Sequence, residues 1–204
     1  MTEISASNGR MRFCAEGGAE HDLEIASTRL GLETVVPYQG DTLGLNLEIQ
    51  AAPLPDGEKG PRFYTNEIDL PPSAFASRDA AMLDGVRISH DYEDAGDDTC
   101  PALLYVAQTA SHDNADRLDL SLNHLGDGRY RVRAAGRTEL SATFEIDTVV
   151  TLEVVILRQD YGRIEPEVEA ALEKFVDRNA VDVDWKLEFK EPDRYRLEAH
   201  FRHM

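Results

Sequence analysis

Apolar and polar residues alternate most clearly between residues 117 and 157. Every second side chain is apolar in residues 118–122 and again in residues 130–134, which is typical of strands that bury one face. Between them lies Gly126-Asp127-Gly128, where the glycines permit positive φ angles and the Asp-Gly pair favours a tight turn. The pattern therefore predicts a β-hairpin, with a third alternating strand over residues 140–146.

Residues 149–157 form an apolar run that is apolar on both faces. Such a run is typical of a central strand that is covered on both sides. It is shorter than the roughly 20 apolar residues that a membrane helix needs, and Glu153 interrupts it. Alternation elsewhere predicts further strands over residues 43–49, 183–189 and 195–201, the last two forming a second hairpin.

Residues 165–179 have the clearest helical pattern in the chain. Pro166 suits the first turn of a helix, and apolar residues then recur with helical spacing on one face. These residues are Val168, Ala171, Leu172, Phe175 and Val176. We also expect a shorter helix over residues 73–83, which begin with a capping serine and contain several alanines.

Together these elements predict an α+β fold, predominantly antiparallel β-sheet, with one long C-terminal helix (about residues 165–179) packed on the sheet. The polar residues 111–116 favour a boundary between two parts of the chain. We therefore expect an N-terminal β-rich subdomain over residues 1–112 and a C-terminal α+β subdomain over residues 113–204. One continuous domain is the alternative.

The chain carries 39 acidic and 21 basic residues, for a formal net charge of −18. A phosphate backbone would repel such a chain, so we expect no direct binding to nucleic acid. Two explanations of the acidity are open. The excess acids either match a basic protein partner, or they only keep the protein soluble.

The most acidic stretch covers residues 90–98, and its acids are the candidate partner-binding residues: Asp91, Glu93, Asp94, Asp97 and Asp98. Clustered oxygens can also hold Ca²⁺ or Mg²⁺. Counted from Asp91, however, Ala95 and Ala102 occupy the fifth and twelfth positions, where an EF-hand loop needs oxygen ligands. We therefore expect an exposed acidic loop rather than a metal site.

No stretch of the sequence matches a catalytic or cofactor motif such as GxSxG, HExxH or GxGxxG. His90, His112 and Asp113 have side chains that can bind transition metals, but nothing in their spacing requires a shared site. The sequence therefore supports no catalytic residue, no cofactor and no metal ligand.

Arg129, Arg131 and Arg133 project from one side of a predicted strand. They form either a ridge that binds an anion or a partner, or a solvated face that is balanced by facing acids. We favour the solvated face.

Cys14 and Cys100 are too few for a disulfide framework or a four-thiolate zinc site, and we expect free thiols, with a single bridge as the alternative. The chain has no apolar run that would span a membrane, and its first residues do not resemble a secretory signal. We therefore expect a cytoplasmic location.

The leading hypothesis is a non-enzymatic acidic binding protein, of which an immunity or inhibitor protein that masks a basic partner is one concrete form. Electrostatic attraction would then make association fast and sensitive to salt. The alternatives are a hydrolase-like enzyme that uses scattered carboxylates and histidines, and a structural subunit that assembles through exposed edge strands such as the last hairpin. Neither the partner nor the oligomeric state follows from the sequence.

Overall fold

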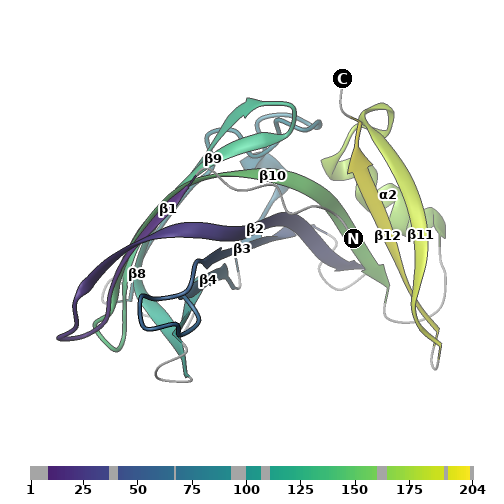
Figure 1. Cartoon of the computed structure of the whole chain (residues 1–204). Coiled ribbons are helices and arrows are strands. Elements are labelled where there is room, and N and C mark those ends of the chain that lie inside the picture. The colour runs from purple at the N-terminus through teal and green to yellow at the C-terminus, as the bar shows by residue number, and fades with distance from the viewer. Residues whose placement is uncertain are drawn as a thin grey trace.

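Strands account for 63% of the chain in the computed structural model, which describes residues 9–36, 41–66, 68–92, 100–106, 111–159, 165–190 and 193–202 (Figure 1). In chain order the strands are β1 (Arg10–Cys14), β2 (Glu20–Val36), β3 (Leu43–Ala51), β4 (Arg62–Thr65), β5 (Asp69–Leu70), β6 (Arg87–Asp91), β7 (Ala102–Val106), β8 (Ser111–Gly126), β9 (Arg129–Thr138), β10 (Thr143–Gln159), β11 (Val181–Lys190) and β12 (Asp193–Phe201). The described helical elements are the α-helix α2 (Glu165–Phe175) and the 3₁₀ turns η1 (Pro72–Ala74) and η2 (Arg178–Ala180).

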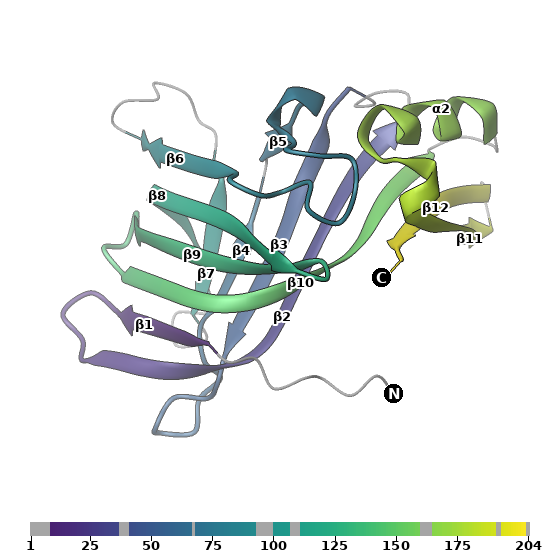
Figure 2. The same ribbon diagram turned by 90° about the horizontal axis from the view of Figure 1, so that it is seen from above.

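Eight of the strands form a closed antiparallel barrel, which Figures 1 and 2 show from two sides. Hydrogen bonding runs in the order β1-β2-β3-β4-β7-β8-β9-β10. β10 then pairs with β1 in antiparallel orientation and with β2 in parallel orientation, which closes the wall. β12 and β11 continue the sheet beyond β10, while β5 pairs with β3 and β6 pairs with β8.

The long strands of the barrel change partners along their length. Residues 143–151 of β10 pair with β9, whereas residues 152–159 pair with β2. Register shifts accompany these changes, at Leu152/Val154 in β10 and at Ala115/Arg117 in β8. Such irregularities bend a strand and increase its twist. As a result β6, β8, β9, β10, β1 and the first part of β2 lie side by side on one wall (Figure 2).

The barrel is filled by a hydrophobic cluster to which alternate side chains of the strands contribute. In β9 the side chains of Tyr130, Val132 and Ala134 are buried, and most of those between them are exposed. Phe63 of β4 and Phe144 of β10 meet in this cluster with their ring centroids 5.3 Å apart. The alternation in the sequence therefore decides which side chains fill the core and which cover the outer wall.

The predicted α+β fold, with a long helix packed on a sheet, is wrong. The sheet closes into a barrel, and α2 ends at Phe175 rather than at residue 179. The Asp177 carboxylate accepts a hydrogen bond from the Asn179 amide at 2.9 Å, so this residue caps η2 instead of continuing α2. The predicted apolar face is right, because all five of its side chains are buried and Phe175 packs edge-on against Phe75 at 6.0 Å.

The short helix predicted over residues 73–83 is also wrong. The structure has η1 at the start of this segment, followed by bends and turns. The buried hydroxyl of Tyr130 holds the segment, since it donates to the Ala80 carbonyl at 2.5 Å and accepts from the Leu83 amide at 3.2 Å. Tertiary contacts of this kind override a local helix propensity.

Both predicted hairpins are confirmed. β8 and β9 pair around Gly126-Asp127-Gly128, whose φ angles are all positive at 102°, 52° and 67°. β11 and β12 form the second pair. The burial on both faces that was predicted for residues 149–157 is found only in residues 154–157, because Thr151 and Glu153 are exposed.

The predicted subdomain boundary near residue 112 lies at the start of β8, and the division into two subdomains stays a prediction. Within the described chain, none of the helices has the length and hydrophobicity that a bilayer crossing requires.

Candidate functional site

The outer side of the wall formed by β6, β8, β9, β10, β1 and the start of β2 is rich in arginine, and we call it the arginine face. Its arginines are Arg10, Arg12, Arg87, Arg117, Arg129, Arg131, Arg133 and Arg137. The four lysines of the chain lie elsewhere, at Lys59 between β3 and β4, at Lys174 in α2, and at Lys186 and Lys190 in β11. The guanidinium group is therefore the side-chain cation that this face presents through its strands.

A hollow of about 770 Å³ lies on the arginine face. Its charged lining consists of four arginines and four carboxylates, so the lining has no formal net charge although the chain carries −18. These side chains are Arg10, Arg12, Arg87, Arg133, Asp22, Asp119, Glu145 and Asp147.

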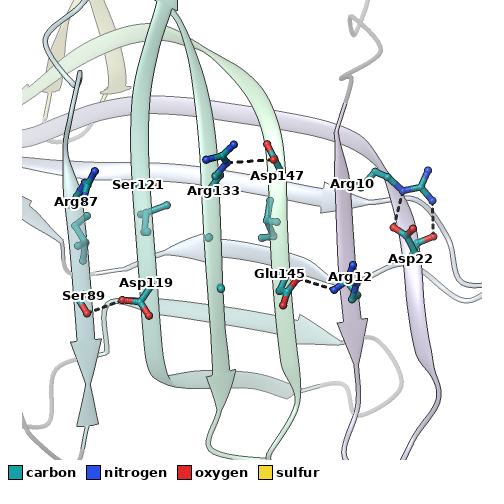
Figure 3. A pocket seen from close by; sticks show the side chains of 15 residues that line it. Arg10, Arg12, Asp22, Arg87, Ser89, Asp119, Ser121, Arg133, Glu145 and Asp147 are labelled. Carbon is teal, nitrogen blue, oxygen red and sulfur yellow. Dashed lines mark hydrogen bonds and ion pairs between the residues drawn. The ribbon is translucent and has the colours of Figure 1, made fainter.

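Strand register arranges the lining in rows that run across the strands (Figure 3). In the first row Arg87 of β6 lies opposite Ser121 of β8, which lies opposite Arg133 of β9. Asp147 of β10 and Arg10 of β1 continue the row. Two arginines thus stand on either side of a short hydroxyl side chain.

The second row lies two residues along each strand. Ser89 of β6 lies opposite Asp119 of β8, which lies opposite Ala135 of β9. Glu145 of β10 and Arg12 of β1 continue this row. Here two carboxylates stand on either side of a methyl group, so the sign of the charge is reversed relative to the first row.

A third row contains Asp91, Arg117 and Arg137 in neighbouring positions of β6, β8 and β9. It lines a second hollow of about 480 Å³. Asp119 and Ala135 line both hollows, so the two are adjacent. The short side chains of Ser121 and Ala135, set among long charged ones, explain why this wall is hollowed.

Asp147 is the carboxylate that the arginines of β9 share. Arg131 donates to it twice, from Nε at 2.8 Å and from a terminal nitrogen at 2.7 Å. Arg133 makes one longer contact with it, at 3.4 Å. The hydrogen bond from Arg131 holds the pKa of Asp147 below its usual range, although partial burial acts in the opposite direction. Arg133 therefore keeps most of its donors available.

Arg87 and Arg117 differ from the other arginines of the face. Neither side chain makes a hydrogen bond or an ion pair within the described part of the chain. The Ser121 hydroxyl likewise has no hydrogen-bond partner among the described residues. The exposed Arg87 and Arg117 and the half-buried Ser121 thus have donors that a ligand could use.

The far end of the face is held by ion pairs between β1 and its neighbours. Arg10 pairs with Asp22 at 2.7 Å and Arg12 pairs with Glu145 at 3.0 Å (Figure 3). The hydrogen bond from Arg10 lowers the pKa of Asp22 below its usual range. Both pairs are exposed, so they orient side chains more than they stabilise the fold.

The candidate partner-binding acids are placed only in part. Asp91 ends β6 and lines the second hollow. Glu93, Asp94, Asp97 and Asp98 lie outside the described residues. Their role in binding a partner stays a prediction.

The expectation that facing acids balance the β9 arginines is confirmed in part, because three arginines meet two carboxylates. Arg131 and Arg133 meet Asp147, and Arg129 lies 4.0 Å from Asp127. Sequence reasoning missed the residues that other strands bring to the same face, above all Arg87, Arg10, Asp119 and Glu145. Their exposed positions follow from alternation, but their proximity follows only from the register of strands that are distant in sequence.

The candidate metal-binding residues His90, His112 and Asp113 do not form one site. His90 pairs in register with Leu118 near the middle of β8, whereas His112 lies at the start of that strand, roughly 20 Å away at about 3.3 Å per residue. His112 packs edge-on against Tyr64 and Tyr105, with centroids at 5.6 and 5.1 Å. The described residues contain no cluster of histidine, cysteine and acid side chains that could hold a metal.

A second charged cluster surrounds Glu198 of β12. Its carboxylate is 6% exposed and meets Lys186, Arg196 at 2.7 Å and His200 at 3.2 Å. Burial raises the pKa of Glu198, but hydrogen bonds from Lys186 and His200 outweigh burial and leave the pKa below its usual range. This cluster joins β11 to β12, and we assign it a structural role.

Comparisons with protein-family models, with curated proteins and with solved structures give no match for this chain. Its function is therefore inferred from its own residues.

Proposed function

We propose that the protein is a non-enzymatic binding protein that binds a basic protein partner on the arginine face. The observation that carries this proposal is the pair of adjacent hollows, which are lined by arginines and carboxylates in alternating rows. Arginine is enriched at protein–protein interfaces, where its planar guanidinium group can bind a carboxylate through two hydrogen bonds. Complementary charges across an interface provide specificity.

The overall charge supports a basic partner. The lining of the main hollow is balanced, so the excess of acids lies on the rest of the surface. Exposed acids include Glu16, Asp56, Glu58, Asp69, Glu153, Glu167, Glu169, Glu173 and Asp184. Such a surface attracts a basic protein over a distance of about one Debye length, roughly 8 Å at physiological salt, and raises the association rate.

An immunity or inhibitor protein that masks a basic toxin or nuclease is the concrete form of this proposal. Its place in the cytoplasm is part of the same proposal and is supported by the two cysteines. Cys14 and Cys100 are free thiols in the structure, which suits a reducing compartment.

Affinity capture with the full chain as bait tests the proposed function. A basic protein should be retained at low salt, and its association rate should fall steeply as ionic strength rises. An Arg87→Ala/Arg133→Ala bait should retain less of it than an Arg29→Ala/Arg62→Ala bait, which has the same formal charge. Arg29 and Arg62 are the matched controls, because both are exposed strand arginines that lie outside the arginine face.

Two results would contradict the proposal. One is a bait that retains no basic protein at any salt concentration. The other is a retained protein that binds the Arg87→Ala/Arg133→Ala bait as tightly as the unmodified chain, since the binding surface would then lie elsewhere.

A further inference from the structure

We infer that the hollow binds two oppositely charged side chains of the partner at once, an acidic one between Arg87 and Arg133 and a basic one between Asp119 and Glu145. This inference rests on the proposed function, and it specifies the chemistry that the partner presents. The occupant is thus a protein segment of mixed charge rather than a uniformly basic one.

The first row supplies the site for the acidic side chain. Neighbouring strands lie about 4.8 Å apart, so the Cα atoms of Arg87 and Arg133 are roughly 9.6 Å apart with Ser121 between them. Both guanidinium groups can lean toward the space above Ser121. Arg87 and Ser121 have no partner in the described structure, and Arg133 has only its contact of 3.4 Å with Asp147. A carboxylate placed there would accept charge-assisted hydrogen bonds from both arginines.

The second row supplies the site for the basic side chain. Asp119 accepts a hydrogen bond from the Ser89 hydroxyl at 2.8 Å, and Glu145 accepts one from Arg12 at 3.0 Å. A carboxylate has about four acceptor positions, so each of these groups can accept a further donor. Ala135 lies between them and leaves space for an ammonium or guanidinium group.

The spacing of the rows selects the geometry of the occupant. Arg133 and Ala135 are two residues apart in β9, and two residues of a strand span about 6.8 Å. Side chains at positions i and i+2 of an extended segment have the same separation. Arg117 repeats the positive charge in the third row, so an acid–base–acid order at i, i+2 and i+4 fits all three rows.

The alternation of charge between the rows also excludes ligands whose charges all have the same sign. Asp119 and Glu145 would repel the middle of a polyanion, and Arg87 and Arg133 would repel the ends of a polycation. The arginine face therefore distinguishes ligands by the order of their charges and not by their net charge. Repulsion of ligands with the wrong order provides this specificity.

Two synthetic peptides test this inference. One is N-acetylated and C-amidated Ser-Glu-Ser-Lys-Ser-Glu-Ser, and the control is Ser-Lys-Ser-Glu-Ser-Lys-Ser with the same caps. The first has a net charge of about −1 and the second about +1 at neutral pH, so the charge of −18 on the protein favours the control. Each is titrated into ¹⁵N-labelled full chain up to millimolar concentration.

The acid–base–acid peptide should shift the amide signals of Ser121 and Ala135, and it should bind at least about fivefold more tightly than the control peptide. Arg87→Ala should weaken its binding about tenfold, on the scale of one lost charge-assisted hydrogen bond, whereas Arg29→Ala should not. Arg87 is exposed and without an ion pair in the described structure, so the variant should keep the native spectrum elsewhere.

Three results would overturn the inference: no shift at Ser121 and Ala135, equal or tighter binding of the control peptide, or equal effects of Arg87→Ala and Arg29→Ala. These failures are distinct from failure of the proposed function. For example, Arg87→Ala/Arg133→Ala could reduce the affinity for a captured basic protein while Asp119→Asn leaves it unchanged. That result would support the proposed function, but it would overturn the inference that the hollow binds two oppositely charged side chains.

Discussion

Tyr130 shows how one buried hydroxyl can decide the conformation of a distant segment. Its side chain lies in the core, and burial raises the pKa of its phenol, which is consistent with a neutral hydroxyl that both donates and accepts. We predict that Tyr130→Phe lowers the free energy of unfolding by roughly 1–3 kcal/mol, because the Ala80 carbonyl and the Leu83 amide lose their partner. Urea unfolding measures this difference. Tyr92→Phe is the control, since Tyr92 is 48% exposed, and an equal loss in both variants would contradict the prediction.

Gly136 is required by close packing under the second hollow. A Cβ atom there would lie 2.3 Å from the Arg117 carbonyl oxygen and 2.6 Å from the Phe144 ring. We predict that Gly136→Ala destabilises the fold by about 1–3 kcal/mol, as expected of overpacking. Gly31→Ala is the matched control, because the nearest atom to its Cβ is the Val154 carbonyl oxygen at 3.4 Å. Thermal unfolding compares the two, and a Gly136→Ala variant no less stable than Gly31→Ala would refute the packing argument.

At the scale of elements, the hairpin β11–β12 depends on the buried carboxylate of Glu198. We predict that Glu198→Gln destabilises the protein by about 1–3 kcal/mol near neutral pH, because Lys186 and Arg196 lose a charged acceptor. The folded pKa of Glu198 is lowered below its ordinary value of 4.5, so its contribution is complete above about pH 4.5 and is lost as the pH falls through the folded pKa. The difference in the free energy of unfolding between Glu198→Gln and the unmodified protein should therefore shrink toward about pH 3.

Urea unfolding at several pH values checks this dependence. Asp184→Asn serves as the control, since Asp184 lies directly opposite Glu198 in β11 and is exposed. Other acids contribute to acid unfolding in both proteins, and they cancel in the difference. The loss of unfolding free energy in Glu198→Gln could instead stay constant from neutral pH to about pH 3. That result would show that hydrogen bonding to the carboxylate is not the cause of the loss.

Sequence pattern predicted the local elements of this chain better than their assembly. Alternation identified the hairpin β8–β9, and helical spacing identified the buried face of α2. Closure of the barrel depends on the parallel pairing of Leu30 with Leu152 and of Val36 with Gln159, which no local pattern specifies. The predicted helix boundary is wrong for a local reason, because Asp177 lies inside the predicted helix but its side chain caps η2.

At the scale of the whole molecule, the candidate site could be predicted only from β9. Arg129, Arg131 and Arg133 are visible in the sequence as a row on one strand, and their balance by acids was expected. The hollow, however, is lined by residues from Arg10 to Asp147. The register of six strands determines which of these residues lie next to each other. A shift of one residue in any pairing would turn these side chains into the core, so the site is a property of the complete barrel.

The net charge of −18 means that electrostatic repulsion opposes the compact folded state. The ion pairs between described residues are mostly exposed, and each contributes little to stability. Repulsion among the excess acids, in contrast, acts over the whole surface. Chloride salts screen this repulsion, so the melting temperature should rise between about 20 mM and about 500 mM NaCl. The variant Glu153→Gln/Glu173→Gln/Asp184→Asn removes three exposed acids, which changes the formal charge from −18 to −15, and its melting temperature should rise less with salt. A melting temperature that falls with NaCl would mean that attraction within ion pairs, above all those of the arginine face, outweighs the repulsion. The surplus acids would then not measurably lower the stability of the fold.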